Sequence, residues 1–566
     1  MTHVSLPTAV HPLLRMLVAS VALLAAAMIA LPAPATAAPT PDPVARAITT
    51  ALATQRISAD EARELRGTWA ASARAARTAR TSSRRASVAA VRTYTTNLAR
   101  SGGLTPERLR PALLSVEATT WTMLKSKDFP SHEEEVSIPG EVVVFTYYSG
   151  RGVQFQPFET YKEGLRQLNT LKPNVDGARA IADRMLQLAT PRGPALTWEY
   201  FFPFGGPSRP WTSSISQAVA TEFYWRVATA LPEAERPAYA NAAEASARSF
   251  QLGTRQGGVS VPQGTGRFYV MYPFAPAQRI LNGHLQVLLN VNRYANASGS
   301  KVARSVVQAG IIGVLPMLAK FDTGAWSNYQ PGQEAELGYH EFQTDQLEKL
   351  GDELPNDTFA DFGSRFNQYL ETPPNITFPT TAIAPIFGAR DGYRDSLTIP
   401  FSVDKRSRVT VVISSADGAE VRRLTTTRGR GEGTLVWDGL DSKRRPVAAG
   451  DYSTRFTVTD VVGNRGFATD ARPLGVRADT LGPTLRLMTV RERGTTTLVT
   501  VNAFDAHSAY VTASVRLGGE VLATVRGPRA GNVTIRVARP MSVVSGGELV
   551  LRDTSGNELV QPLSQG

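Results

Sequence analysis

Residues 371–380, ETPPNITFPT, separate two kinds of sequence pattern in this chain. Before them, from residue 157 to 369, apolar residues recur at helical spacing in successive runs that end at Pro, Gly or Asn. After them, apolar and polar residues alternate as in half-buried strands, with Gly and Asp at the turns. The sequence therefore predicts a multidomain α + β protein whose helical and all-β parts follow one another along the chain.

The helical runs between residues 157 and 372 have similar lengths and short connections. Such helices are expected to pair as antiparallel hairpins, and we predict that they wind into an α/α toroid, an incomplete α/α barrel. A ring of this kind leaves a central cleft that suits a sugar chain. The change of pattern after residue 372 also predicts that this unit folds without the strands that follow it.

The strand-rich part predicts two C-terminal immunoglobulin-like β-sandwiches, over residues 377–476 and 477–566. The two segments end in similar turns, DVVGN at 460–464 and DTSGN at 553–557, as expected if one fold occurs twice. A separate, short β-hairpin region is expected earlier in the chain, at 128–156.

The first 37 residues have the pattern of a secretory signal peptide, 1–37, because Arg15 precedes an apolar run and small residues follow at 35–37. We therefore expect a secreted or cell-surface protein with a linker at 38–57. No second apolar stretch approaches membrane length, so no integral membrane segment is expected after signal removal. The chain contains no cysteine, so ordinary packing must hold its domains together.

A basic helical segment is expected at 58–127. Between Arg63 and Arg110 the sequence has eleven arginines and two acidic residues, so most of the formal charge of +12 lies here. A capping box at Ser58–Glu61 begins a predicted helical hairpin that breaks near TSSRR, 81–85. Either these arginines form a solvated face, or they dock an acidic polysaccharide. Nucleic acid is not an expected partner, because the sequence has no base-reading motif.

Motifs in the helical part occur together in one known family. They are RPWTSSISQA (209–218), FYVMYPFAPAQRILNG (268–283), FDTGAWSNY (321–329) and GYHEFQTDQL (338–347). In order and spacing they resemble the C-terminal catalytic domain of D-glucuronyl C5-epimerases. The resemblance implies an isomerase that inverts C5 of glucuronate residues within a heparosan-like acidic polysaccharide.

The resemblance also implies site residues. It implies catalytic tyrosines at Tyr272, Tyr329 and Tyr339 and substrate-binding residues at Trp211, Gln217, Asn282 and His340. It implies no metal and no cofactor, which agrees with the lack of metal-binding and nucleotide-binding motifs in a credible context. A second resemblance, over residues 387–465, is to the immunoglobulin-like domain of flagellar hook-capping proteins, and it concerns fold alone.

The chemistry of C5 inversion requires acid/base groups on both faces of the sugar ring, because a proton leaves beside a carboxylate and another returns from the opposite side. Tyrosine, with an unperturbed pKa of about 10, can donate a proton as it stands. An abstracting tyrosine needs a neighbouring cation that lowers its pKa, and Arg209, Arg267 and Arg279 are the candidates. A polysaccharide lyase on a similar toroid would begin with the same abstraction and is a further possibility.

The sequence departs from the family pattern at charged positions. Met271 and Gly338 stand where the family has acidic residues, Gly332 stands where it has an arginine, and Gln343 replaces a second histidine. These changes leave open a non-catalytic, cell-surface glycan-binding protein on the same fold.

Individual motif residues also have structural interpretations. Helical spacing puts Tyr339 on one side with Phe342 and Leu347, as in a core aromatic residue. His340 is interpreted more readily as a hydrogen-bonding residue than as a base, and Asp322–Gly324 as a helix-ending turn.

Overall fold

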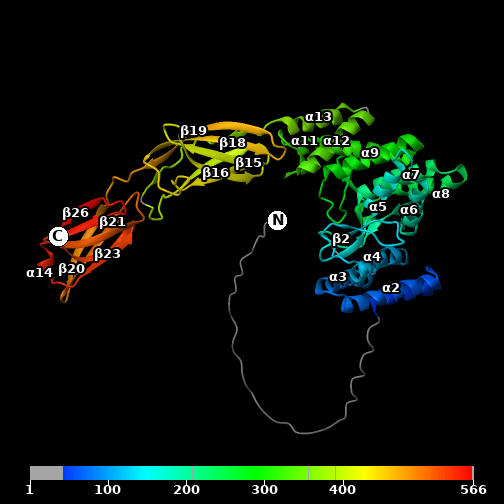
Figure 1. The fold of residues 1–566 in the computed structure, drawn as a ribbon, viewed down its shortest axis with the longest axis horizontal. Coiled ribbons are helices and arrows are strands. Elements are labelled where there is room, and N and C mark those ends of the chain that lie inside the picture. Colours follow the sequence, from blue (N-terminus) through cyan, green and yellow to red (C-terminus); the bar gives the residue numbers. More distant parts are fainter. Residues whose placement is uncertain (1–41, 207–208, 355, 389, 564–566) are drawn as a thin grey trace, which may run out of the picture.

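The computed structural model describes residues 42–206, 209–354, 356–388 and 390–563. The expected signal peptide, 1–37, lies outside these residues. Figure 1 shows an elongated molecule, with the helical part at one end and two all-β units in line beyond it. The prediction of a mixed protein, helical first and strand-rich afterwards, is confirmed.

The N-terminal helices share a hydrophobic core of their own, which includes Trp69 and Leu113. Residues expected to be a linker instead form the first helix, because the Asp42 side chain caps its first turn and Ile48 is buried in that core. The predicted break in the basic segment is present, and Thr81 accepts a hydrogen bond from the Arg84 amide there. The helices are α1 (Pro43–Ala53), α2 (Ala59–Thr78), α3 (Ser82–Arg100) and α4 (Pro106–Lys125).

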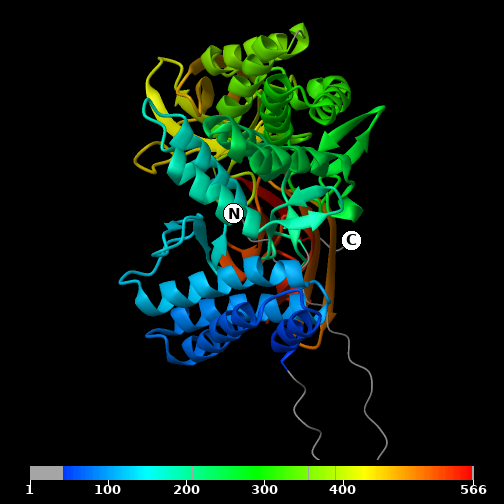
Figure 2. The same cartoon turned by 90° about the vertical axis from the view of Figure 1, so that its right-hand side faces the viewer.

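A small antiparallel sheet follows, formed by β1 (Glu135–Val136), β2 (Phe145–Tyr148) and β3 (Gly152–Phe155). It packs on α4, where Thr119 Oγ1 accepts a hydrogen bond from Val153 N at 2.9 Å. Figure 2 shows the N-terminal helices as a layer below this sheet and the later helices above it. The sheet therefore lies where the two helical groups meet.

The larger helical group has one continuous core, and each predicted helical run contains a helix. Helix α7 packs against α5, α8 and α9, and α12 packs against α9 and α13. The helices are α5 (Pro157–Leu168), α6 (Val175–Gln187), α7 (Ser214–Ala230), α8 (Arg236–Arg248), α9 (Leu281–Ser298), α10 (Lys301–Val314), α11 (Leu318–Phe321), α12 (Leu337–Glu353) and α13 (Asp357–Glu371).

Short hairpins lie between these helices, and the sequence pattern did not predict them. Strands of two to four residues are too short to show alternation, and tight turns or loops set their pairing. The pairs are β4 (Thr190–Arg192) with β5 (Ala195–Thr197), β6 (Glu199–Tyr200) with β7 (Trp211–Thr212), β8 (Ser260–Gln263) with β9 (Gly266–Tyr269), and β10 (Asn328–Gln330) with β11 (Gln333–Glu334).

One stretch, Lys301–Phe321, is long and apolar enough to cross a membrane by length and composition. The expectation that no second stretch reaches membrane length is therefore wrong. In this structure the stretch contains α10, which packs against α9 and β9. Its side chains Val306, Val307 and Val314 are buried.

The first β unit has two sheets, and their facing residues form one core that contains Phe401, Trp437 and Phe456. One sheet has the order β12 (Ile376–Thr377), β14 (Leu397–Val403), β17 (Gly431–Trp437); the other has the order β13 (Ile386–Phe387), β19 (Arg465–Arg477), β18 (Gly450–Asp460), β15 (Ser407–Ser414), β16 (Glu420–Arg428).

The second β unit also has two sheets over one core. One has the order β20 (Thr484–Arg493), β21 (Thr496–Phe504), β24 (Ala530–Val537); the other has the order β23 (Glu520–Pro528), β22 (Tyr510–Leu517), β25 (Glu548–Arg552), β26 (Glu558–Pro562). A short helix, α14 (Met541–Val544), precedes β25.

The two similar turns noted in the sequence make equivalent contacts. Asp460 Oδ1 accepts backbone hydrogen bonds within the first turn, and Asn464 Nδ2 donates to Leu370 O in α13 at 2.7 Å. In the second turn Asp553 accepts from the Asn557 amide, and Asn557 Nδ2 donates to Asp479 O at 3.0 Å. Each asparagine thus binds the backbone that leads into its own β unit.

Candidate functional site

The three tyrosines singled out in the sequence come from separate elements. Tyr272 lies in the loop after β9, Tyr329 in β10 and Tyr339 in the first turn of α12. The rings of Tyr329 and Tyr339 are 4.8 Å apart. Tyr339 is 46% exposed, so its interpretation as a core aromatic is wrong, while Tyr272 and Tyr329 are half-buried.

Tyr272 also belongs to an aromatic cluster on the neighbouring hairpins. Its ring stacks on Phe204 at 5.7 Å and is tilted against Trp211 at 5.8 Å. Trp211 is only 8% exposed, because its indole stacks on Tyr200 at 4.2 Å and donates to Phe202 O. The half-buried members of the cluster, whose rings can meet a ligand, are Tyr148, Phe204, Tyr272 and Phe274.

Protonation of these tyrosines follows from burial. Burial raises the pKa of Tyr272 to about 12, with repulsion from Tyr339 and Tyr148 adding to the shift. Burial also raises the pKa of Tyr329, and Tyr272 and Tyr339 add to it. Both Tyr272 and Tyr329 are neutral at pH 7 and can act as proton donors.

None of the three arginines considered as replacement cations acts on Tyr272 or Tyr329. Arg279 donates to Gln263 and lies over the Phe268 ring at 5.4 Å. Arg209 lines a different cavity, beside Trp211 and Phe274. The cation that tyrosinate chemistry requires is therefore not supplied by these residues.

His340 lies inside the helical unit and does not reach its surface. It is fully buried, with Nδ1 2.7 Å from Ser327 Oγ and Nε2 2.9 Å from Phe366 O. Its ring stacks on Trp326 at 3.8 Å. Burial lowers the pKa of His340 to about 4, so the imidazole is neutral at pH 7. It joins the β10–β11 hairpin to α13, as its interpretation as a hydrogen-bonding residue predicts.

Gln217 and Asn282, also expected to bind substrate, are buried. Gln217 Nε2 donates to Trp198 O at 3.2 Å, and its Oε1 has no partner in the described residues. Asn282 O accepts a hydrogen bond from Gln346 Nε2 at 3.0 Å. Both residues therefore lie beneath the surface and contact neighbouring protein groups.

A polar chain that the sequence interpretation missed continues from Asn282 along α9. Gln346 donates to Gln286 at 2.9 Å, Gln286 to Asn290, and Asn290 to Glu222 Oε2. Burial raises the pKa of Glu222. The signal was present in the sequence, because Asn282, Gln286 and Asn290 recur every four residues along this helix.

This polar chain borders a cavity of about 770 Å³ between α5, α7, α9 and α12. Glu222, Gln286, Asn290 and Phe342 line it, and Phe342 lies one turn beyond Tyr339 on α12. Glu159 lines the same cavity and helps to raise the pKa of Tyr148 in the aromatic cluster. Helix α12 carries both Phe342, which lines the cavity, and Tyr339, and the cavity and the half-buried aromatic rings are together called the candidate groove.

The departures from the family pattern have structural explanations. Met271 packs against Gly283. A Cβ added at Gly283 would lie only 2.4 Å from Met271 Cγ, so the methionine fills the space beside this glycine. Gly332 occupies the turn between β10 and β11 with φ of +83°, a backbone region that disfavours arginine. Gln343 donates to Ser327 Oγ and Asn328 O, so it holds the hairpin. Within the described ranges, no cluster of His, Cys, Asp or Glu is placed to hold a metal ion.

Many arginines of the basic segment make internal contacts. Arg84 is 4% exposed and donates to Thr122 O, Met123 O and Lys127 O at the end of α4. Arg92 lies over the Trp69 ring at 3.7 Å. Arg108 binds the buried Glu199 with two hydrogen bonds of 2.6 and 2.7 Å, which joins α4 to β6. The segment is thus only partly a free cationic surface, with Arg74 and Arg77 exposed.

Comparisons with known proteins agree with both resemblances. Residues 192–368 match the family model described as D-glucuronyl C5-epimerase C-terminus, and residues 394–461 match the FlgD Ig-like domain. The protein is therefore epimerase-like over the first of these ranges. No curated protein matches the chain significantly.

Solved structures resemble the chain only weakly. The hook-capping protein FlgD of Xanthomonas campestris is 18% identical over 29% of this chain and 91% of its own, with a TM-score of 0.14. A bacterial ice-binding adhesin is 18% identical over 33% and 62%, with a TM-score of 0.19. A β-glucuronidase of Bacteroides uniformis is 15% identical over 38% and 27%, with a TM-score of 0.13. Scores this low do not establish a shared overall structure.

Proposed function

We propose that the protein is exported, binds an acidic polysaccharide in the groove beside Tyr272, Tyr329 and Tyr339, and inverts C5 of its glucuronate residues. The observation that carries the proposal is the contact between Tyr329 and Tyr339, which come from separate elements and whose rings lie 4.8 Å apart. The family match over 192–368 contains all three tyrosines. The neighbouring aromatic rings suit a sugar chain, because they offer flat apolar faces.

The architecture that we propose for this function is an incomplete α/α toroid at 157–372, followed by two immunoglobulin-like sandwiches. Packing of α7 against α5, α8 and α9 supports the toroid. The two-sheet cores of the β units support the sandwiches.

The tyrosines divide the proton transfers between them in this proposal. Tyr272 and Tyr329 are neutral and are assigned to protonation of C5 and to hydrogen bonding of the developing enolate. Tyr339 is assigned to abstraction, because its 46% exposure gives its proton a route to solvent. Since the two faces need separate groups, Tyr339 and at least one other tyrosine are required.

Binding without catalysis is the second candidate function, and a specific observation favours it. Burial raises the pKa of Tyr272 and Tyr329, and no cationic side chain lowers either value. A groove with aromatic rings and buried amides would then retain glycan binding alone. A lyase would use the same first step but would shorten the polymer and leave an unsaturated uronate.

Deuterium exchange separates these functions. The full chain is incubated with heparosan in heavy water, and deuterium at C5 is measured by NMR together with iduronate content and chain length. Epimerisation predicts deuterium and iduronate without shortening. Binding alone leaves C5 unlabelled, and shortening with an unsaturated product identifies a lyase.

Tyrosine-to-phenylalanine variants test the assigned residues. Tyr339→Phe should lower the exchange rate by roughly 10²- to 10⁴-fold, because it removes one acid/base group and keeps the ring. Tyr510→Phe, on an exposed tyrosine of the second β unit, is the matched control and should exchange normally. Equal rates for all variants would contradict a tyrosine-based mechanism.

A further inference from the structure

A second cavity, of about 400 Å³, lies where the β10–β11 hairpin meets the first β unit. The hairpin contributes Asn328, Gly332 and Glu334, and the first β unit contributes Arg406, Arg428 and Arg430. All three arginines are exposed, and none forms an ion pair within the described chain. The cavity therefore places three cationic side chains, none in an ion pair, beside the carboxylates of Glu334 and Glu336.

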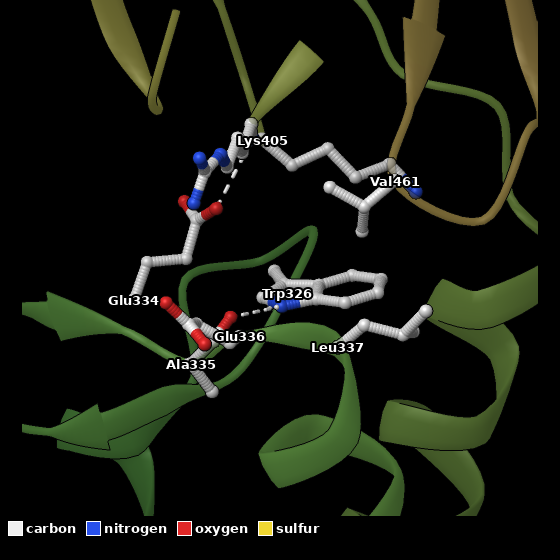
Figure 3. Close-up of a pocket in the computed structure, with 8 residues that line it drawn as sticks. Trp326, Glu334, Ala335, Glu336, Leu337, Lys405 and Val461 are labelled. Atoms are coloured by element: carbon white, nitrogen blue, oxygen red, sulfur yellow. Dashed lines mark hydrogen bonds between the residues drawn. The ribbon is translucent and has the colours of Figure 1, made fainter. Parts of the chain in front are cut away.

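Glu334 adds an unusual acceptor to this cavity. Its Oε1 accepts a hydrogen bond from Arg406 N at 3.1 Å, whereas its Oε2 is buried and has no partner in the described residues. Figure 3 shows this carboxylate between the hairpin and the first β unit, in the adjoining pocket that Trp326 and Lys405 line. A buried, unpartnered carboxylate oxygen is costly unless a ligand or solvent donor meets it.

The combination matches one kind of ligand. Arginine binds carboxylates through paired N–H donors, and a carboxylate oxygen accepts hydrogen bonds from hydroxyl groups. A sugar acid carries both a carboxylate and hydroxyls on the same ring. A simple inorganic anion would satisfy the arginines but would offer no hydroxyl donor to Glu334 Oε2.

We propose that this cavity is a subsite for an acidic sugar residue of the polymer, with Arg406, Arg428 and Arg430 at its carboxylate and Glu334 Oε2 at a hydroxyl. The identity of the polymer rests on the proposed function. The first β unit is then part of the binding site and not a spacer.

The position of the cavity relative to Tyr329 supports this assignment. Asn328 and Gly332 line the cavity, and Tyr329 lies next to Asn328 in β10. The Tyr329 ring packs against Tyr339, while Asn328 lines the cavity. A polymer that passes over the hairpin edge would contact both.

Binding of heparosan to the full chain tests the subsite. The triple variant Arg406→Gln, Arg428→Gln, Arg430→Gln should bind roughly tenfold or more weakly and with a smaller salt dependence. Arg455→Gln, Arg491→Gln, Arg493→Gln removes the same charge from exposed, unpaired positions elsewhere and should change Kd less than twofold. Equal weakening by both triple variants, unchanged binding by the first, or equally tight binding of neutral dextran would overturn the proposal.

Glu334→Gln distinguishes a hydroxyl acceptor from a merely electrostatic patch. Removing one negative charge should tighten the binding of an anion if charge alone matters. The proposal expects weaker heparosan binding, because the amide presents an NH2 donor in place of one of the two oxygens that accept from Arg406 N–H and from a sugar hydroxyl. Tighter binding would overturn it. Affinity is measured without turnover, so these results stand apart from C5 exchange, which tests the proposed function.

Discussion

Lys405 Nζ lies 3.0 Å from Asp460 Oδ2, in an ion pair whose side chains are 2% and 0% exposed. The same ammonium donates to Tyr369 O at 2.9 Å and to Thr372 O, carbonyl groups at the end of α13. It also lies over the Trp326 ring at 5.4 Å. Lys405 of the first β unit therefore binds carbonyl groups at the C-terminal end of α13. It also packs over Trp326, which precedes the hairpin that carries Tyr329.

A fragment that ends at residue 372 should melt at a lower temperature than one that ends at residue 477. It loses the Lys405 contacts to α13 and exposes Trp326, although the change of sequence pattern predicts independent folding. Circular dichroism of fragments 42–372 and 42–477 would measure the difference. Identical midpoints for the helical signal would show that the first β unit does not stabilise the helices.

Lys405→Met should lower the free energy of unfolding by about 3–5 kcal/mol, because it leaves Asp460 buried without its charged partner. Chemical denaturation of the full chain measures this change. Lys349→Met, in an exposed helical pair with Asp345, is the matched control and should cost less than about 1 kcal/mol. A similar, small loss for both variants would mean that the buried pair contributes little.

Acid should destabilise the protein through two buried histidines. Burial lowers the pKa of His284 to about 3 and that of His340 to about 4, from 6.5. Below pH 6.5 the unfolded chain binds protons that the folded chain excludes, so stability is complete above pH 6.5 and falls toward pH 4. Each histidine contributes a slope of about 1.4 kcal/mol per pH unit.

The double variant His284→Asn, His340→Asn isolates this effect. It should be less stable at pH 7.5 but should show a shallower loss between pH 6.5 and 4 in urea titrations. His132→Asn, at an exposed histidine, should leave the slope unchanged. A double variant with the wild-type slope would assign the acid sensitivity to carboxyl groups instead.

Glu199→Gln should destabilise the contact between α4 and the larger helical group by about 3 kcal/mol. Arg108 and Arg192 both bind this buried carboxylate, and the amide leaves them without a negative partner. Glu163→Gln, in the exposed pair with Arg166, should cost less than about 1 kcal/mol in the same denaturation experiment. Comparable values would show that Glu199 is replaceable.

The helices and the all-β units were predictable because their apolar spacing extends over many residues. The hairpins were not, since a pair such as β10 and β11 depends on a turn at Gly332 and on side chains distant in sequence. The length of the apolar stretch that contains α10 was underestimated, and in the structure α10 packs against α9.

The candidate site was predictable to a similar, limited extent. Motif positions identified Tyr272, Tyr329 and Tyr339, but not that His340 points into the core toward Phe366 O. The helical wheel of α12 wrongly suggested a buried Tyr339, because it cannot show where neighbouring helices leave a groove. Counting charges could not show that the Arg84 guanidinium donates hydrogen bonds to carbonyl groups of α4.

The repeated asparagine contacts have a mechanical consequence. Asn557 fastens the second β unit to the chain at Asp479, and Asn464 fastens the first to Leu370 at the end of α13. A pulling force applied beyond the second β unit would pass through these fastenings to α13, and from there through Phe366 and His340 to the hairpin of Tyr329. Tension on the β units would then be transmitted to the hairpin that carries Tyr329.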